Sequence, residues 1–377
     1  MERMDVRVTQ LRGFLATDPT NINLACDLAD ALCAQAEYAQ AEAVLRGLPD
    51  GETAPGPAFR LARIDLIHGR HAQAEAGYRG LVEHGHDNLA IRHDLAFAQL
   101  CQRHVDDAAA TVEAALARFE PAPALFVLKG RIELMRERYD DAVAALDRAL
   151  QLDPDDEAAQ GVRALALFDA SRFEEAAIAA RDCLLRYPEQ HEALLVAGTM
   201  SLWQSDLDSA QALFERGLQR HPNSGRALSG YGQLQMLRND LPAARDTLHH
   251  AVVAMPDHIG TWHALAWTQL LQNDRDAAET SYRKAYELDR NFGDTHGGLA
   301  LIDALRGDYD AAEQGIKRAL RLDPQAVTAR YAKTLVLEAR GENAAADALM
   351  GELMPGSPLP VHEFAQRLKA TLGIQPR

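Results

Sequence analysis

Two segments of the sequence begin like the zinc-binding helix of many metalloproteases. They are His191-Glu192 and His362-Glu363, and each starts the pattern His-Glu-x-x-His. The pattern needs a second histidine four residues after the first, so that two imidazoles share one face of a helix. Leu195 and Gln366 stand there instead. We therefore expect ordinary surface residues and no metal site at either place.

Histidine is densest at His68, His71, His84 and His86. The first two flank a turn between two predicted helices, and the last two close the second of those helices. Thirteen helical residues span ~20 Å at 1.5 Å per residue. The two pairs should therefore lie at opposite edges of the fold, which disfavours a site with four metal ligands. We expect no bound metal and no cofactor.

The motifs of nucleotide binding and nucleophilic catalysis are missing from the sequence. It contains no GxGxxG after a strand, no GxxxxGK[ST] and no GxSxG. Acidic runs such as Asp153-Pro154-Asp155-Asp156-Glu157 fall between predicted helices or in a first helical turn, where acids cap helices and favour the dipole. These patterns predict that the chain is not an enzyme.

Composition and charge narrow the class of protein further. The chain of 377 residues is 47% hydrophobic and 25% charged, as in folded globular proteins, and its formal charge is 39 − 55 = −16. Nucleic acid is a poor partner for so acidic a chain. The N-terminus has no signal-peptide pattern, no run of 18 apolar residues occurs, and the four cysteines form no CxxC pair. We expect a cytoplasmic protein with reduced thiols and no membrane insertion.

The elements that position these residues repeat along the chain. Alanine recurs at an interval of 33 and then of 34 residues, at Ala41, Ala74, Ala108, Ala142, Ala176, Ala210, Ala244, Ala278, Ala312 and Ala346. Twelve residues before each alanine, nine of ten residues are Gly or Ala, and twelve residues after it proline recurs from Pro154 onwards. Small residues at a fixed interval favour close helix crossings.

Each 34-residue unit has the pattern of two helices. Between Asp155 and Pro188, one helix is predicted over 157–170 and a second over 173–187, with a break at Ser171-Arg172. Proline at the end of the unit cannot continue a helix. Gly69, Gly307 and Gly341 fall between the helices of other units, where a left-handed cap residue is favoured. The fold class is therefore all-α.

These residues carry a family resemblance. The segments Tyr139–Pro154 and Gly307–Pro324 match the tetratricopeptide repeat most closely, and Trp262 holds its early aromatic position. The chain resembles this family over residues 22–358, as about ten units. The resemblance implies a right-handed superhelical α-solenoid of 34-residue helix-turn-helix repeats, whose first helices line a concave groove.

The ends depart from the period, as solenoid ends must. We expect residues 1–20 to form an N-terminal capping helix, residues 21–358 the repeats, and residues 359–377 a C-terminal capping helix. The last of these has Phe364, Leu368 and Leu372 on one face, to cover the final unit.

The resemblance also implies which residues face the groove: the second, fifth, ninth, twelfth and thirteenth of each unit. Read at those positions, candidate partner-binding residues are Phe59, Arg63, His93, Phe97, Arg131, Thr199, Trp203, Ser229, Gln233, Met236, His263 and Trp267. Aromatic and Arg residues dominate interface hot spots. For Phe97 and Trp203, packing between units is an equal alternative. For Trp267 we favour the groove, because Trp262 already fills the core position of that unit.

Two known binding modes of the family lack their residues here. The ninth positions hold no Asn and the fifth no Lys, so neither the two-carboxylate clamp for chaperone C-termini nor the Asn ladder of O-linked sugar transferases is indicated. We expect a scaffold or adaptor that binds a protein or peptide in the groove. The alternative is a substrate-docking module or subunit of an enzyme such as a sulfotransferase or glycosyltransferase. Only about 17 residues follow the last unit, too few for a catalytic domain.

Overall fold

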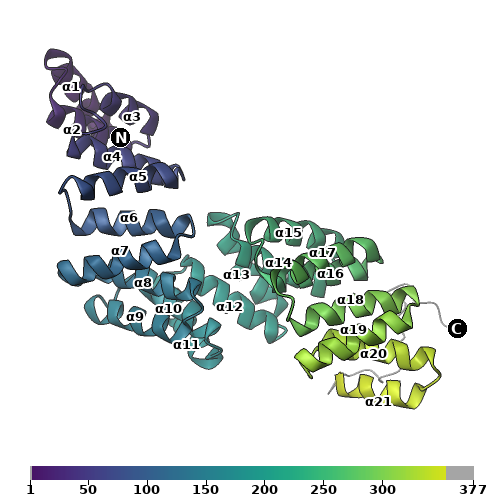
Figure 1. The fold of residues 1–377 in the computed structure, drawn as a ribbon. Helices are drawn as coiled ribbons and strands as arrows, with labels where there is room; N and C mark the ends of the chain where they lie inside the picture. Colours follow the sequence, from purple (N-terminus) through teal and green to yellow (C-terminus); the bar gives the residue numbers. More distant parts are fainter. Residues whose placement is uncertain (1, 354–377) are drawn as a thin grey trace. The chain divides into compact units, whose positions relative to one another are not determined.

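The computed structural model describes residues 2–353, and all the regular structure in that part of the chain is helical (Figure 1). The chain divides within α12 into two compact units, one up to Ala193 and one from Leu194. We call them the N-terminal and C-terminal units and describe each by itself. Together the described helices are one leading helix, α1, followed by ten helix pairs, α2/α3 to α20/α21.

The N-terminal unit contains α1 (Glu2–Thr17), α2 (Ile22–Cys33), α3 (Tyr38–Arg46), α4 (Pro55–Ile67), α5 (His71–Glu83), α6 (Leu89–Cys101), α7 (Val105–Arg118), α8 (Pro123–Met135), α9 (Tyr139–Leu152), α10 (Glu157–Asp169) and α11 (Phe173–Arg186). The division falls in α12 (His191–Trp203). The C-terminal unit continues with α13 (Leu207–Arg220), α14 (Gly225–Leu237), α15 (Leu241–Ala254), α16 (Ile259–Leu271), α17 (Arg275–Leu288), α18 (Gly293–Arg306), α19 (Tyr309–Leu322), α20 (Val327–Ala339) and α21 (Asn343–Leu353).

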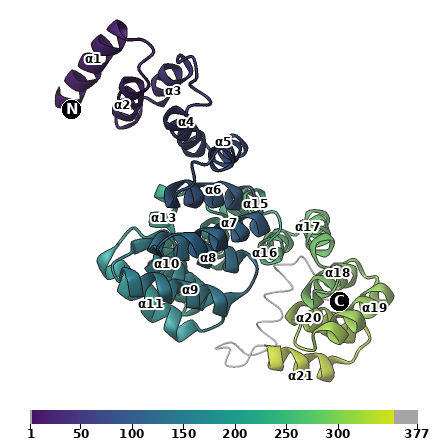
Figure 2. The same ribbon diagram turned by 60° about the vertical axis from the view of Figure 1, so that its left-hand side comes forward.

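The predicted all-α repeat solenoid is confirmed. The helices predicted over 157–170 and 173–187 are α10 and α11, and within each unit helices that follow one another in the chain lie side by side (Figures 1 and 2). At the N-terminal end, α1 packs Val8 and Leu11 against α2. The C-terminal capping helix, with Phe364, Leu368 and Leu372, lies outside the described residues. Below, position one of a repeat is the first residue of its first helix, for example Pro123 or Glu157.

The small-residue register is a packing seam between paired helices. All ten alanines at position twenty are buried, Ala176 among them. Opposite them, position eight is Gly or Ala in nine repeats. A Cβ atom added at Gly130 would lie 2.7 Å from Cγ of Leu146, and one at Gly232 would lie 2.6 Å from Cγ of Leu248. Only a residue without a larger side chain permits this approach.

Each pair turns through one residue in the left-handed region. Position fifteen has a positive φ in all ten pairs, although only Gly69, Gly307 and Gly341 are glycines there. The backbone N–H of the next residue donates to the carbonyl of position eleven, as Arg138 does to Glu133 at 2.9 Å. This bond closes the helix end and fixes the turn. The prediction that the three glycines act as left-handed caps is confirmed.

Candidate partner-binding surface

The first helices of the repeats form one side of each unit. Contacts join α4 to α6 and α6 to α8 in the N-terminal unit, and α14 to α16 and α18 to α20 in the C-terminal unit. We call this side the first-helix face. The predicted groove residues all come from first helices, and the two units hold five and seven of them, respectively.

In the N-terminal unit, Phe97 and Arg63 are the open members of the predicted set. Phe97 is 38% exposed, and Arg63 is exposed and makes no salt bridge to another described residue. Phe59 is half-buried and packs its edge against Tyr78, with ring centroids 5.9 Å apart. His93 is half-buried, with Nδ1 3.0 Å from Oδ1 of Asp94. Phe97 and Arg63 are therefore the residues that a partner would meet.

Arg131 holds together two repeats that are not neighbours. Its guanidinium lies 2.6 Å from the carboxylate of Glu192, which also accepts a hydrogen bond from Gln190 at 2.6 Å. Burial alone would raise the pKa of Glu192, but the charge of Arg131 and the hydrogen bonds to the carboxylate together outweigh burial, and the pKa is lowered. A Cβ at Gly161 would lie 1.9 Å from Cδ of Gln190, so the glycine makes room for this network. Arg131 is occupied by an internal ion pair.

Most predicted polar residues of the C-terminal unit bond within the chain. Ser229 is buried and accepts from the hydroxyl of Thr261 at 3.1 Å. Gln233 donates to the Ser229 carbonyl at 3.3 Å, and the Thr199 hydroxyl donates to the Leu195 carbonyl at 2.9 Å. Met236 Sδ lies 3.5 Å from the Thr268 hydroxyl. Buried polar groups need hydrogen-bond partners, so these bonds stabilise the packing of the repeats.

His263 and Trp267 pack between repeats. Burial lowers the pKa of His263 to about 4, and its Nε2 lies 2.8 Å from the Thr295 hydroxyl. Trp267 is half-buried against the core of the unit, with its ring centroid 6.4 Å from that of Tyr331. Trp262 is also half-buried and donates to the Pro256 carbonyl at 2.8 Å.

Trp203 differs from Trp267, because 55% of its surface is exposed at the end of α12. Three further exposed residues with large apolar side chains share its place in the repeat, position thirteen, and the sequence analysis did not single them out. They are Ile67 at 51%, Met135 at 39% and Leu237 at 56%. The 34-residue register would have found them, since each ends a first helix.

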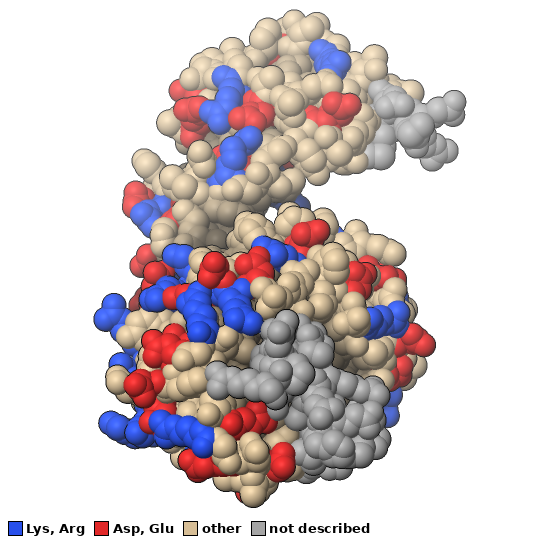
Figure 3. All heavy atoms as spheres, turned by 90° about the vertical axis from the view of Figure 1, so that its right-hand side faces the viewer, with Lys and Arg blue, Asp and Glu red and all other residues tan. Residues whose placement is uncertain are grey.

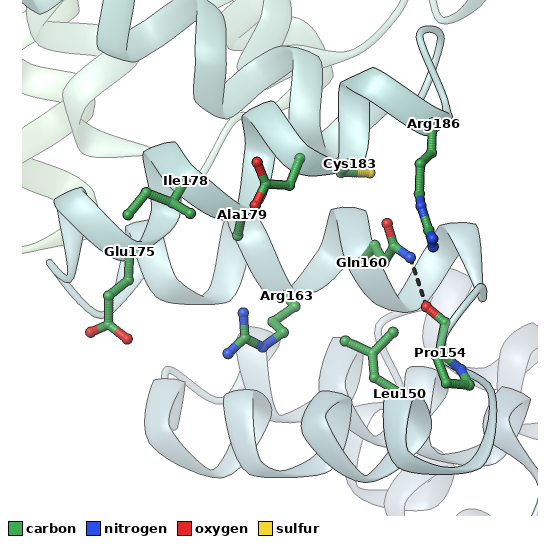
Figure 4. A pocket seen from close by; sticks show the side chains of 10 residues that line it. Leu150, Pro154, Gln160, Arg163, Glu175, Ile178, Ala179, Cys183 and Arg186 are labelled. Atoms are coloured by element: carbon green, nitrogen blue, oxygen red, sulfur yellow. Dashed lines mark hydrogen bonds between the residues drawn. The ribbon is translucent and has the colours of Figure 1, made fainter.

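A pocket of the N-terminal unit lies between α9, α10 and α11 (Figure 4). Its volume is about 460 Å³, and Leu150 and Ile178 supply apolar walls. Arg163 bonds to Asp147 at 2.5 Å, and Arg186 bonds to Asp155. Because both cations are neutralised within the chain, the pocket offers no unpaired charge from Arg163 or Arg186 to a ligand.

Charged side chains and possible metal ligands are distributed over the described residues as follows. On the face drawn in Figure 3, basic and acidic side chains lie interspersed among uncharged ones. Between residues 2 and 353, no three His, Cys, Asp or Glu side chains are grouped so as to hold a metal ion. None of the helices in that range combines the length and apolar character that a membrane crossing requires.

Models of known protein families match three segments of the chain. Three family models, each described as a tetratricopeptide repeat, match residues 93–157, 202–267 and 259–292. No curated protein is a significant match to the chain.

Several solved structures are similar in fold to this chain. Two structures of a monomeric mutant of IFIT1, one with Gppp-AAAA and one with m7Gppp-AAAA, have TM-scores of 0.57 and 0.58 at 15% identity, over 93% of this chain and 90% of theirs. A tetratricopeptide repeat protein from Parabacteroides merdae has a TM-score of 0.47 at 14% identity, over 66% of this chain and 98% of that one.

At such low identity the IFIT1 structures show the fold alone. The repeat matches support a general role as a protein-interaction scaffold. With the 34-residue period, the ten helix pairs and the three matches agreeing, this chain belongs to the tetratricopeptide repeat family.

Proposed function

We propose that this chain is an adaptor that binds a protein or peptide on the first-helix face of its repeats, and that it catalyses no reaction itself. The observation that carries the proposal is Trp203, an indole ring with 55% of its surface exposed on that face. Tryptophan is the residue type most enriched among interface hot spots. Phe97 supplies a second exposed aromatic ring on the same face of the other unit.

A protein partner fits the charges better than a nucleic acid does. The related IFIT1 structures hold Gppp-AAAA, a polyanion. Here the net charge is −16, and two arginines of first helices are paired, Arg131 with Glu192 and Arg60 with Asp30, while Arg63 makes no salt bridge to another described residue. Polyanion binding needs unpaired basic residues. All four cysteines are free thiols, which supports the cytoplasm as the place of this interaction.

The test is a comparison of two matched substitutions. A partner isolated on the immobilised chain is titrated against Trp203→Ala and against Leu185→Ala, which alters an exposed residue of a second helix. Losing one Trp anchor costs about 2 kcal/mol, so we expect Trp203→Ala to weaken binding ~30-fold and Leu185→Ala to leave it unchanged. Equal affinities for the two variants would refute the assignment of the face. Binding of a capped RNA oligonucleotide at micromolar concentration would overturn the choice of a protein partner.

A further inference from the structure

Position thirteen is apolar along almost the whole chain. Its residues are Ala34, Ile67, Cys101, Met135, Asp169, Trp203, Leu237, Leu271, Leu305 and Ala339. In the C-terminal unit we call Trp203, Leu237, Leu271 and Leu305 the apolar row. Trp203 and Leu237 are more than half exposed, and Leu271 and Leu305 are half-buried. A single exposed Leu carries no information, but large apolar residues at one register of four successive repeats form a surface.

A second row runs three residues later along the same turns. We call it the aspartate row: Asp206, Asp240, Asp274 and Asp308. Each caps a second helix by accepting a backbone N–H, at 3.1 to 3.3 Å. Asp274 also pairs with Arg245 at 3.0 Å, whereas the other three make no salt bridge to a described residue. Three residues of chain span at most ~11 Å, so the Cα atom of each aspartate lies within that distance of the Cα atom of its apolar neighbour.

The N-terminal unit is mostly basic at this register. Its five corresponding residues are Glu37, Arg70, His104, Arg138 and Arg172, and none makes a side-chain cap. Asp is among the best capping residues, so helix capping explains the aspartates of the C-terminal unit. It does not explain the residues at the same register of the N-terminal unit. The two units therefore present edges of different electrostatic character, and the C-terminal one has Asp206, Asp240 and Asp308, without an ion pair to a described residue, three positions after large apolar residues.

The spacing of the rows selects the conformation of a ligand. Packed helices lie about 8–10 Å apart, and α14 packs against α16, so Leu237 and Leu271 of the apolar row are separated by about that distance. A polyproline II chain has three residues per turn and advances 3.1 Å per residue, or ~9 Å per turn. One turn of such a chain therefore matches one repeat. An amphipathic helix buries a stripe at least ~100° wide, and the apolar row is one side chain wide.

We propose that the apolar row and the aspartate row together bind an extended, basic segment of a partner protein. In that segment every third residue is apolar and contacts the apolar row, and each triplet carries a Lys or Arg that faces the aspartate row. The proposal rests on the protein-binding role above and adds the sequence pattern and charge of the ligand. Charge complementarity selects this occupant, because an acidic segment would meet Asp206, Asp240 and Asp308, none of which has an ion pair among the described residues.

Three labelled peptides test the pattern by fluorescence anisotropy on the whole chain at low salt. The first is Leu-Pro-Lys repeated four times, the second has the same composition in an order that breaks the threefold spacing, and the third has Glu in place of Lys. We expect the first to bind and to weaken as salt is added, and the other two to bind at least tenfold more weakly. No binding of the first peptide at 1 mM, or equal binding of all three, overturns the proposal.

Substitutions of the protein separate charge from folding. The triple variant Asp206→Asn, Asp240→Asn, Asp308→Asn removes three charges, and Asn caps a helix as well as Asp does. Each exposed ion pair changes affinity about twofold, so we expect about eightfold weaker binding of the first peptide at an unchanged melting temperature. The matched control, Asp107→Asn, Asp140→Asn, Asp141→Asn, removes three exposed carboxylates from the N-terminal unit and should leave binding unchanged.

The outcomes distinguish this proposal from the general one. Equal binding by the triple variant and its control would refute the role of the aspartate row. If a native partner then still loses affinity with Trp203→Ala, the adaptor role stands and only the pattern of the ligand is wrong. If neither the peptide nor a native partner responds to Trp203→Ala, both proposals fail.

Discussion

The left-handed turn residue gives the sharpest test of the fold, and Gly307 and Glu137 provide opposite changes at the same register. Gly307 has φ +84°, and a Cβ added there would have no atom within 4 Å. Glu137 adopts φ 59° with a full side chain. Substitution at either residue therefore changes the conformational energy of the backbone. At Gly307 the new Cβ atom also meets no other atom, so no steric clash adds to that energy.

The expected sizes follow from two opposing terms. A non-glycine residue in the left-handed region costs about 1–2 kcal/mol, and glycine loses about 0.5–1 kcal/mol more conformational free energy on folding. Gly307→Ala should therefore destabilise its unit by about 0.5–1 kcal/mol, and Glu137→Gly should stabilise its own by a similar amount. With a urea slope of about 1–3 kcal/mol/M, the unfolding midpoints should move by about 0.2–1 M.

Urea unfolding followed by circular dichroism measures both changes. Asn239→Gly serves as the intermediate case, because asparagine is the residue after glycine that best accepts φ 61°. It should shift the midpoint less than Glu137→Gly does. Shifts of the same sign for Gly307→Ala and Glu137→Gly would refute the argument that the backbone at position fifteen sets the energy.

Three further predictions follow from burial. Ala176→Leu should lower stability by about 1–3 kcal/mol, because the buried seam has no room for three more carbon atoms; an unchanged melting midpoint would contradict the seam. Trp267→Ala should lower the melting temperature more than Trp203→Ala does, since Trp267 packs on the core and 55% of Trp203 is exposed; differential scanning fluorimetry checks the order. Burial lowers the pKa of His263 to about 4 in the folded state, against 6.5 in the unfolded chain. The contribution of the neutral ring to the free energy of unfolding is therefore complete above pH 6.5 and is lost as the pH falls towards 4. Urea midpoints at pH 7 and pH 5 should therefore differ more for the unaltered chain than for His263→Gln, and equal differences would contradict the burial of this ring.

The repeat boundaries could be predicted because local rules agree with the fold. The helix predicted over 157–170 ends at Asp169, one residue early. Small residues recur in every repeat, and prolines mark most of the later junctions, so the boundaries follow from the sequence. The turn conformation of Glu137 could not be predicted. Its left-handed φ opposes its own preference and is imposed by the hydrogen bond from Arg138 to the carbonyl of Glu133.

The sequence predicts which positions of the repeat form the candidate surface, but it does not predict which side chains at those positions are exposed. Trp203 and Trp267 belong to the same face by spacing, but only the structure shows that the second ring packs near Tyr331, 64 positions further along. The bond from Thr261 to Ser229 likewise depends on a residue in the next repeat. Periodicity specifies which face a residue occupies, whereas the neighbouring repeats decide whether its side chain remains open.

Two contacts between described residues of this solenoid skip a repeat. Arg131 of α8 reaches Glu192 of α12, and Trp267 of α16 lies near Tyr331 of α20. In an ordinary repeat array only adjacent repeats interact, so each can open nearly alone. Here the repeat between the two partners is held from both sides. Hydrogen exchange should therefore reveal two blocks, α8–α12 and α16–α20, in which three repeats open together and amides share one protection level.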